Sequence, residues 1–166
     1  MITRRDAFTK PVLPQQIKDI MHTFTDTQGR AWIITLNVDT IRRVRSVLNI
    51  NLLEAIEGRL LEQLMTDPVL LCDILFVVIQ PEAVANGISD EDFGRALGGD
   101  VLEAATTALL EELVDFFPSA KRTVFRKALA KLKQLETLAI ETATQRLESP
   151  ELEERMKTAL ASTPGS

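Results

Sequence analysis

Few of the side chains that catalysis requires are present in this chain. Its 166 residues include one histidine, one cysteine and no tyrosine. A thiol nucleophile would need His22 as its base, but Cys72 lies in the most apolar stretch, where burial raises a thiol pKa and lowers its reactivity. A zinc site would need two carboxylates besides these two residues, and no ligand spacing supports one. We therefore expect that the protein is not an enzyme and that it has no catalytic residue, no metal and no cofactor.

Signals for secretion or membrane insertion are also missing. With Cys72 alone, no intramolecular disulfide can form, which favours a reducing compartment. The residues after Met1 contain no apolar run of the kind found in a secretory signal. The longest apolar run, 69–79, is interrupted by Asp73 and is shorter than the roughly 20 residues that span a bilayer. These absences predict a cytoplasmic protein without a membrane segment, in which 69–79 is a buried helix.

The charge of the chain is distributed unevenly. Apolar residues make up 45% and charged residues 26%, as in a folded globular protein. The middle, 61–118, holds twelve acidic residues and one basic residue, whereas 1–60 and 119–166 each hold nine basic and six acidic residues. This pattern favours docking of the basic flanks on the acidic middle, or head-to-tail pairing between copies. A solvated acidic face without a partner is the simpler alternative.

A β-hairpin is predicted near the start of the chain. The β-rich runs 21–25 and 30–36 are joined by 26–29, where Gly29 can adopt the positive φ that a hairpin loop requires. A two-stranded hairpin is marginal alone, so its apolar side chains need a helix or another chain to cover them. The hairpin residues that we consider candidates for protein binding are Phe24, Trp32 and Ile34.

The rest of the chain shows helical periodicity interrupted by turn residues. Asp67 and Pro68 predict the start of a helix that Pro81 should end after about Ile79. The longest predicted helix, 119–147, has no proline or glycine. Its apolar stripe, which either completes the core or packs against a second copy, is formed by Val124, Ala128, Leu132, Leu135, Ala139 and Thr142.

The fold class is therefore mainly α, of the α+β type, with an N-terminal β-hairpin followed by a bundle of six or seven helices. We expect a flexible arm at 1–18 and a domain of hairpin and helices at 19–118. The remainder, 119–166, should form the long helix and a short C-terminal helix, packed on the domain or on a partner.

Basic residues cluster in the first half of the long helix, with no acidic residue among them. Pairing with the acidic segment 90–115, within one chain or between subunits, would offset the cost of basic charge near a helix N-terminus. Nucleic-acid binding is disfavoured because the protein is acidic overall, and a solvated face is the third alternative. The cluster comprises Lys121, Arg122, Arg126, Lys127, Lys131 and Lys133, of which the first four are our candidate protein-binding residues.

The order of these features resembles the tail assembly chaperones of long-tailed bacteriophages. The resemblance covers about residues 20–118 and rests on the hairpin from Phe24 to Val38, the helix starting at Asp67, the acidic turn from Ser89 to Phe93, and the ending Phe116-Phe117-Pro118.

The resemblance implies a small domain that binds the tape-measure protein and recruits tail-tube subunits in the cytoplasm of the bacterial host. It implies no catalytic residue and no cofactor. The helix at 119–147 lies beyond it, and a longer frameshifted form would leave no trace in this sequence. A small regulatory or nucleic-acid-binding protein that uses the basic helix at 121–133 is the alternative.

Overall fold

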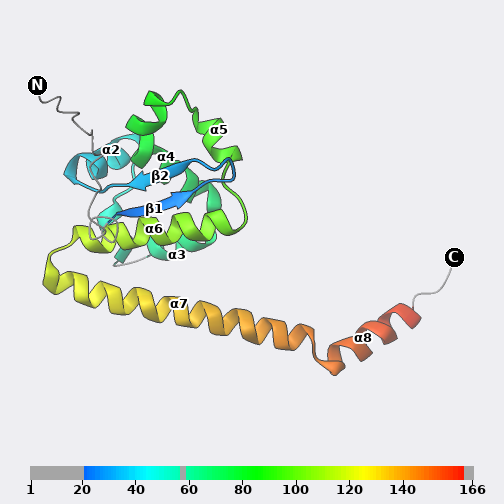
Figure 1. The fold of residues 1–166 in the computed structure, drawn as a ribbon. Coiled ribbons are helices and arrows are strands. Elements are labelled where there is room, and N and C mark those ends of the chain that lie inside the picture. Colours follow the sequence, from blue (N-terminus) through cyan, green and yellow to red (C-terminus); the bar gives the residue numbers. More distant parts are fainter. Residues whose placement is uncertain (1–20, 57–58, 163–166) are drawn as a thin grey trace, which may run out of the picture. The chain divides into compact units, whose positions relative to one another are not determined.

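The computed structural model describes residues 21–56 and 59–162, so the arm predicted at 1–18 lies outside the described residues (Figure 1). The chain divides into two compact units, Met1–Pro118 and Ser119–Ser166. The described elements are a β-hairpin, one 3-10 helix and seven α-helices. The predicted class, mainly helical with an N-terminal hairpin, is confirmed.

The hairpin consists of β1 (His22–Thr25) and β2 (Ala31–Ile34), which pair antiparallel with Phe24 opposite Trp32. Gly29 has a φ of 79°, as its place in the hairpin loop predicts. Alternation along the two strands turns one face inward, while Thr23, Thr25 and Ile33 are exposed on the other face. Among the described residues, cover is thus found on the inward side of the hairpin.

Six helical elements follow the hairpin in the described part of the first unit, and some of them cover its inward face. The six elements are α2 (Val38–Leu48), η1 (Leu52–Ile56), α3 (Arg59–Thr66), α4 (Pro68–Ala85), α5 (Asp90–Arg95) and α6 (Asp100–Phe116). Side-chain oxygens of Asn37, Asp67 and Ser89 accept backbone N–H groups at the starts of α2, α4 and α5, as expected for these cap residues. In Figure 1, α6 runs beside β1, and α4 packs against α2 and β2.

The end predicted for the apolar helix at Ile79 is wrong, because α4 continues through Pro81 to Ala85. Proline has no N–H, so it cannot donate the helical hydrogen bond to the Val77 carbonyl one turn earlier. Arg43 of α2 supplies that donor instead, with its Nε 3.0 Å from the Val77 oxygen and its Nη2 3.2 Å from the Val78 oxygen. A side chain from another helix therefore compensates for the proline.

Among the described residues, α4 is also the helix with the length and hydropathy to cross a membrane. Seven of its eighteen residues, all apolar, are packed inside the first unit, whereas Val69 and Val84 near its ends are exposed. The buried members are Leu71, Ile74, Leu75, Val77, Val78, Ile79 and Ala83. This agrees with the buried helix expected from the sequence.

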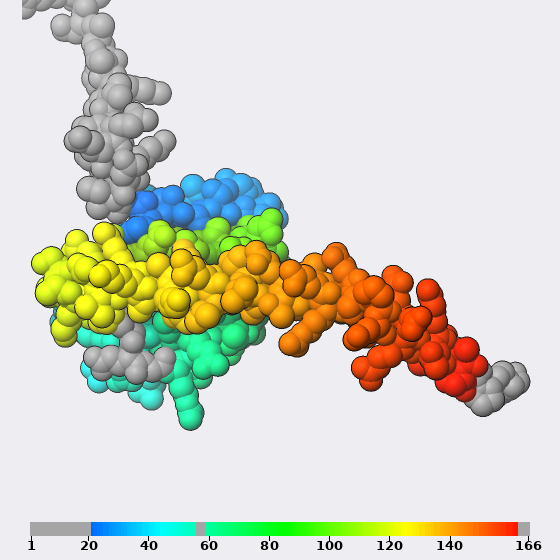
Figure 2. All heavy atoms as spheres, turned by 90° about the horizontal axis from the view of Figure 1, so that it is seen from below, coloured from blue at the N-terminus to red at the C-terminus, as the bar shows by residue number. Residues whose placement is uncertain are grey.

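The second unit contains α7 (Ser119–Leu147) and α8 (Pro150–Ala161). The bounds of α7 are those predicted from the sequence. Pro150 occupies the first helical turn of α8, where its missing N–H costs nothing. None of the twelve residues of α8 is buried, and Figure 2 shows side chains standing apart from one another along this helix.

Candidate protein-binding surfaces

The hairpin residues proposed as a binding surface lie in the core of the first unit. Phe24, Trp32 and Ile34 are exposed by only 4%, 2% and 1%. The ring of Phe93, on α5, meets the Trp32 ring edge-on at 5.5 Å and the Phe24 ring at 6.4 Å. The sequence did not decide whether a helix of the same chain or another chain covers the hairpin. In the structure, helices of the same chain do. These three residues therefore do not form an exposed protein-binding surface.

The hairpin loop is organised by Asp26, whose side chain is fully buried. Its carboxylate accepts hydrogen bonds from the indole Nε1 of Trp32 at 2.9 Å and from the Nε of Arg30 at 2.7 Å. The backbone N–H groups of Gln28 and Arg30 donate to its other oxygen. The Arg30 guanidinium also lies 5.7 Å from the centroid of the Trp32 ring, a cation–π distance.

This arrangement determines the protonation of the buried carboxyl group. Burial by itself raises the pKa of Asp26, because it penalises the charged form. The hydrogen bonds from Trp32, Arg30 and Gln28 stabilise the carboxylate and together outweigh burial, so the pKa lies below its ordinary value. Asp26 is therefore a buried anion that holds the loop and the strand together.

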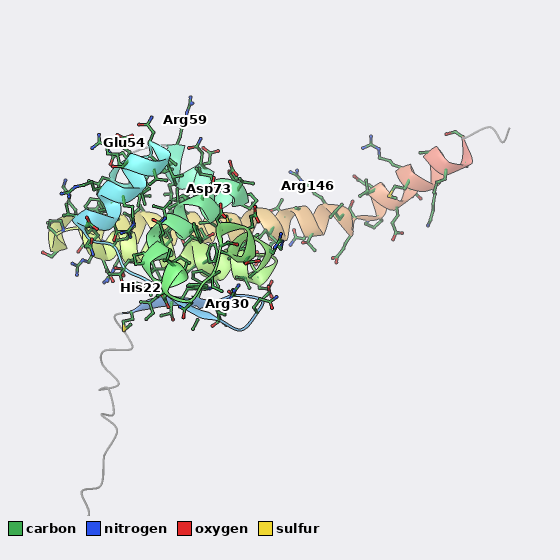
Figure 3. All side chains as sticks on the ribbon, turned by 90° about the horizontal axis from the view of Figure 1, so that it is seen from above. His22, Arg30, Glu54, Arg59, Asp73 and Arg146 are labelled. Carbon is green, nitrogen blue, oxygen red and sulfur yellow. The ribbon has the colours of Figure 1, made fainter. Side chains whose placement is uncertain are left out.

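Acidic residues of α6 connect the other end of the hairpin to this helix. The Nε2 of His22 lies 3.0 Å from an Asp115 oxygen, and its Nδ1 lies 3.3 Å from a Glu111 oxygen. Glu112 accepts the backbone N–H of Leu36 at 2.9 Å. Figure 3 shows His22 and Arg30 at opposite ends of the hairpin. His22 is thus a strand residue that connects β1 to α6.

Cys72 lies on α4, half-buried, and faces α5. Burial raises the pKa of its thiol, with a further contribution from the negative charges of Asp73 and Asp90. A raised pKa leaves little thiolate near neutral pH, so this thiol is a poor nucleophile.

The basic candidates all lie in the first half of α7. Lys121, Arg126 and Lys127 are exposed, and Arg122 is partly exposed. At 100° per residue, Arg122 and Arg126 follow one side of the helix, whereas Lys127 and Lys131 follow another. The helix therefore presents two basic rows, on either side of its apolar stripe.

Large apolar side chains are also exposed on α7 and α8. Leu135, Leu138 and Leu147 of α7 are exposed by 52%, 57% and 70%, and Leu160 of α8 by 75%. At 100° per residue, Leu135 and Leu138 lie on neighbouring parts of α7, whereas Leu147 lies on the side opposite to Leu138. Sequence periodicity identified Leu135 but not Leu138 or Leu147, because these two lie beside the stripe and not within it.

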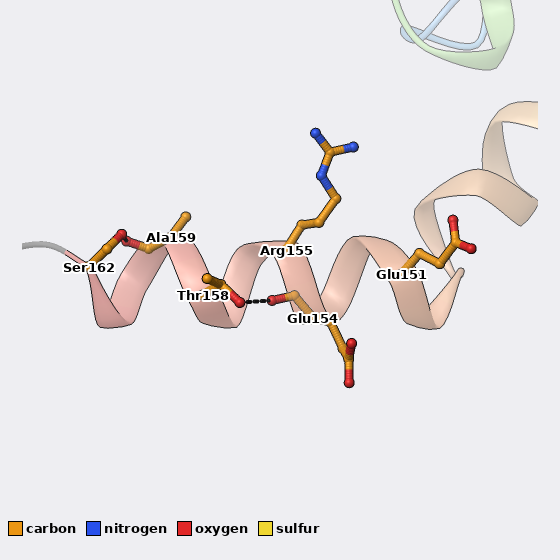
Figure 4. A pocket seen from close by; sticks show the side chains of 6 residues that line it. All are labelled: Glu151, Glu154, Arg155, Thr158, Ala159 and Ser162. Atoms are coloured by element: carbon orange, nitrogen blue, oxygen red, sulfur yellow. Dashed lines mark hydrogen bonds between the residues drawn. The ribbon is translucent and has the colours of Figure 1, made fainter.

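Hollows in the described part of the chain do not suggest a small-molecule site. One lies along α8, and the residues that line it come from this helix and its C-cap, so no second element encloses it (Figure 4). These residues are Glu151, Glu154, Arg155, Thr158, Ala159 and Ser162. Another, between the end of α2, η1 and α3, is lined mostly by polar residues such as Asn49, Asn51 and Gln63. The described residues also contain no group of three or more His, Cys, Asp or Glu residues placed to hold a metal ion.

Comparison with known proteins adds no relative. No protein-family model, no curated protein and no solved structure matches this chain.

Proposed function

We propose that this protein is a non-catalytic tail assembly chaperone of a phage or prophage, which binds tape-measure and tail-tube proteins in the bacterial cytoplasm. The observation that carries the proposal is the second unit, whose two helices expose large apolar side chains such as Leu138, Leu147 and Leu160. Such helices suit transient binding to other helices, because apolar side chains at helical spacing fit the groove of a partner.

Two further features support a binding role. The order of hairpin, helices and acidic turn resembles that family over about residues 20–118. The Cys72 thiol is poorly suited to nucleophilic chemistry, because its pKa is raised. His22 contacts Asp115 and Glu111 of α6.

The proposal is tested by co-expressing the full chain with the tape-measure and tail-tube proteins encoded beside it. We expect both to co-purify with the wild-type chain. The double variant Leu138→Glu/Leu147→Glu should lose them, because charge on these exposed positions prevents apolar contact. A matched control is Thr137→Glu/Gln145→Glu, which adds the same charge at two exposed polar positions of α7.

Two results would contradict the proposal. One is the absence of any tail protein from the wild-type purification. The other is a neighbourhood of genes that encodes no tail-tube or tape-measure protein.

Nucleic-acid binding through the basic helix is the second candidate. Six basic residues within 121–133 favour it, but their division into two rows leaves no continuous basic face of the kind that follows a phosphate backbone. A gel shift at low salt, abolished by Lys127→Glu/Lys131→Glu and weakened steeply by salt, would favour this function over the chaperone.

A further inference from the structure

An apolar seam follows one face of α7 through its central turns. We use this name for Ala128, Leu132, Leu135 and Ala139, which are spaced by four, three and four residues. Residues at these spacings form the a and d positions of a coiled coil. Leu135 is 52% exposed, Ala128 and Ala139 are exposed, and Leu132 is partly exposed. The seam is therefore accessible to a second helix.

The order of residues in the seam is the same from either end, alanine, leucine, leucine, alanine. A second copy can consequently match it in both orientations with layers of equal size. In an antiparallel pair, Ala128 faces Ala139 of the second copy and Leu132 faces Leu135. In a parallel pair each residue faces its own equivalent. Apolar packing alone does not distinguish the two.

Charge does distinguish them. Within α7, residues 119–133 contain six Lys or Arg residues and no acidic residue, whereas 134–147 contain Glu136, Glu141 and one basic residue, Arg146. A parallel pair would place the two strongly basic halves side by side, which is repulsive. An antiparallel pair instead places each basic half along the half of the other copy that carries Glu136 and Glu141.

We propose that two copies of this chain pair through α7 in an antiparallel arrangement, with Ala128 of one copy facing Ala139 of the other. The inference does not depend on the function proposed above. A second copy is the favoured occupant because one helix supplies both the seam and the complementary halves. Its 29 residues also provide about 44 Å of contact length. A helix of a different protein on the seam is an outcome that the test separates.

Disulfide cross-linking tests the orientation in the full-length chain. In a Cys72→Ser background, which removes the chain's one cysteine, Ala128→Cys and Ala139→Cys are made as separate variants. Upon oxidation we expect a covalent dimer when the two variants are mixed, and none from either variant alone. In an antiparallel pair, position 128 of one copy is separated from position 128 of the other by 11 residues along the helix, about 16 Å. A disulfide needs Cα atoms about 6 Å apart.

Light scattering provides a second measurement on the same protein without cysteine chemistry. The wild-type chain should have the mass of a dimer, and Leu135→Glu should shift it to the monomer. Gln134→Glu adds the same charge at the neighbouring exposed position and should remain dimeric. Circular dichroism establishes that each variant keeps its helices.

Three results would overturn the proposal. Covalent dimers from each variant alone would indicate parallel pairing. A monomeric wild-type chain, with no cross-link in the mixture, would indicate that the seam belongs to a different protein. A dimer that tolerates Leu135→Glu would locate the interface elsewhere.

Discussion

At the scale of single residues, Asp26 is the group on which the hairpin loop depends most. Four donors converge on its buried carboxylate. Asparagine would keep the shape but replace one acceptor oxygen by an NH2 group, which would then face donors. We expect Asp26→Asn to lower the free energy of unfolding by about 2 kcal/mol near neutral pH, as measured by urea denaturation.

The same residue gives a dependence of stability on pH. The pKa of Asp26 is below its ordinary value of 3.8 in the folded protein, so the folded state binds fewer protons than the unfolded state in this range. The stability that the carboxylate provides is complete above that ordinary value and is lost as the pH falls through the folded-state pKa. The difference between the wild type and Asp26→Asn should therefore shrink below about pH 4. A difference that stays constant to lower pH would contradict the lowered pKa.

Two glycines should respond to alanine in opposite ways. Gly94 has a helical conformation in α5, and an added Cβ would meet the Cys72 Sγ at 3.6 Å, an ordinary contact. Gly94→Ala should raise the free energy of unfolding by about 0.5–1 kcal/mol, because alanine favours the helix. Gly99 has a φ of 56° before α6. Gly99→Ala should lower the free energy of unfolding by about 1–2 kcal/mol, because alanine is strained in this backbone conformation. Equal effects in thermal denaturation would refute this distinction.

At the scale of elements, the compensation for Pro81 by Arg43 can be measured with a double-mutant cycle. Arg43→Met removes the donors to the Val77 and Val78 carbonyls and should cost about 1–2 kcal/mol. In a Pro81→Ala background the alanine N–H restores the helical donor to Val77, so the same change should cost less than half as much. Arg42→Met, on the exposed side of α2, serves as the control. Equal costs in both backgrounds would mean that the arginine acts independently of the proline.

Helix bounds followed from the sequence where the signals that set them are local. Pro118 and Pro150 flank α7, and Asp67 with Pro68 starts α4, so these ends were predictable. The end of α4 was not, because a proline is compatible with a helix interior only if another group satisfies the freed carbonyl. That group is Arg43 of α2, and nothing in the sequence around Pro81 indicates it.

At the scale of the whole molecule, the hairpin side chains were recognised as needing a cover, but the sequence did not decide between a helix of the same chain and a partner. Sequence alternation shows which face of a strand is apolar, not which helix meets it. Phe93, which completes the aromatic cluster, lies in a short acidic segment whose periodicity is weak. On α7, periodicity indicated the apolar stripe with Leu135 but not Leu138 or Leu147, which lie beside that stripe.

The position of Trp32 gives the two units separate optical signals. Trp32 is the one tryptophan of the chain and is buried against Phe93 and Asp26. Its fluorescence therefore reports unfolding of the first unit alone. Circular dichroism also reports the 29 residues of α7 and the 12 of α8. If copies pair through α7, the dichroism transition should shift to higher temperature as protein concentration rises. The temperature of the tryptophan transition should depend on protein concentration only to the extent that pairing stabilises the first unit. The difference between the fluorescence and dichroism curves would therefore measure how strongly the two units are coupled.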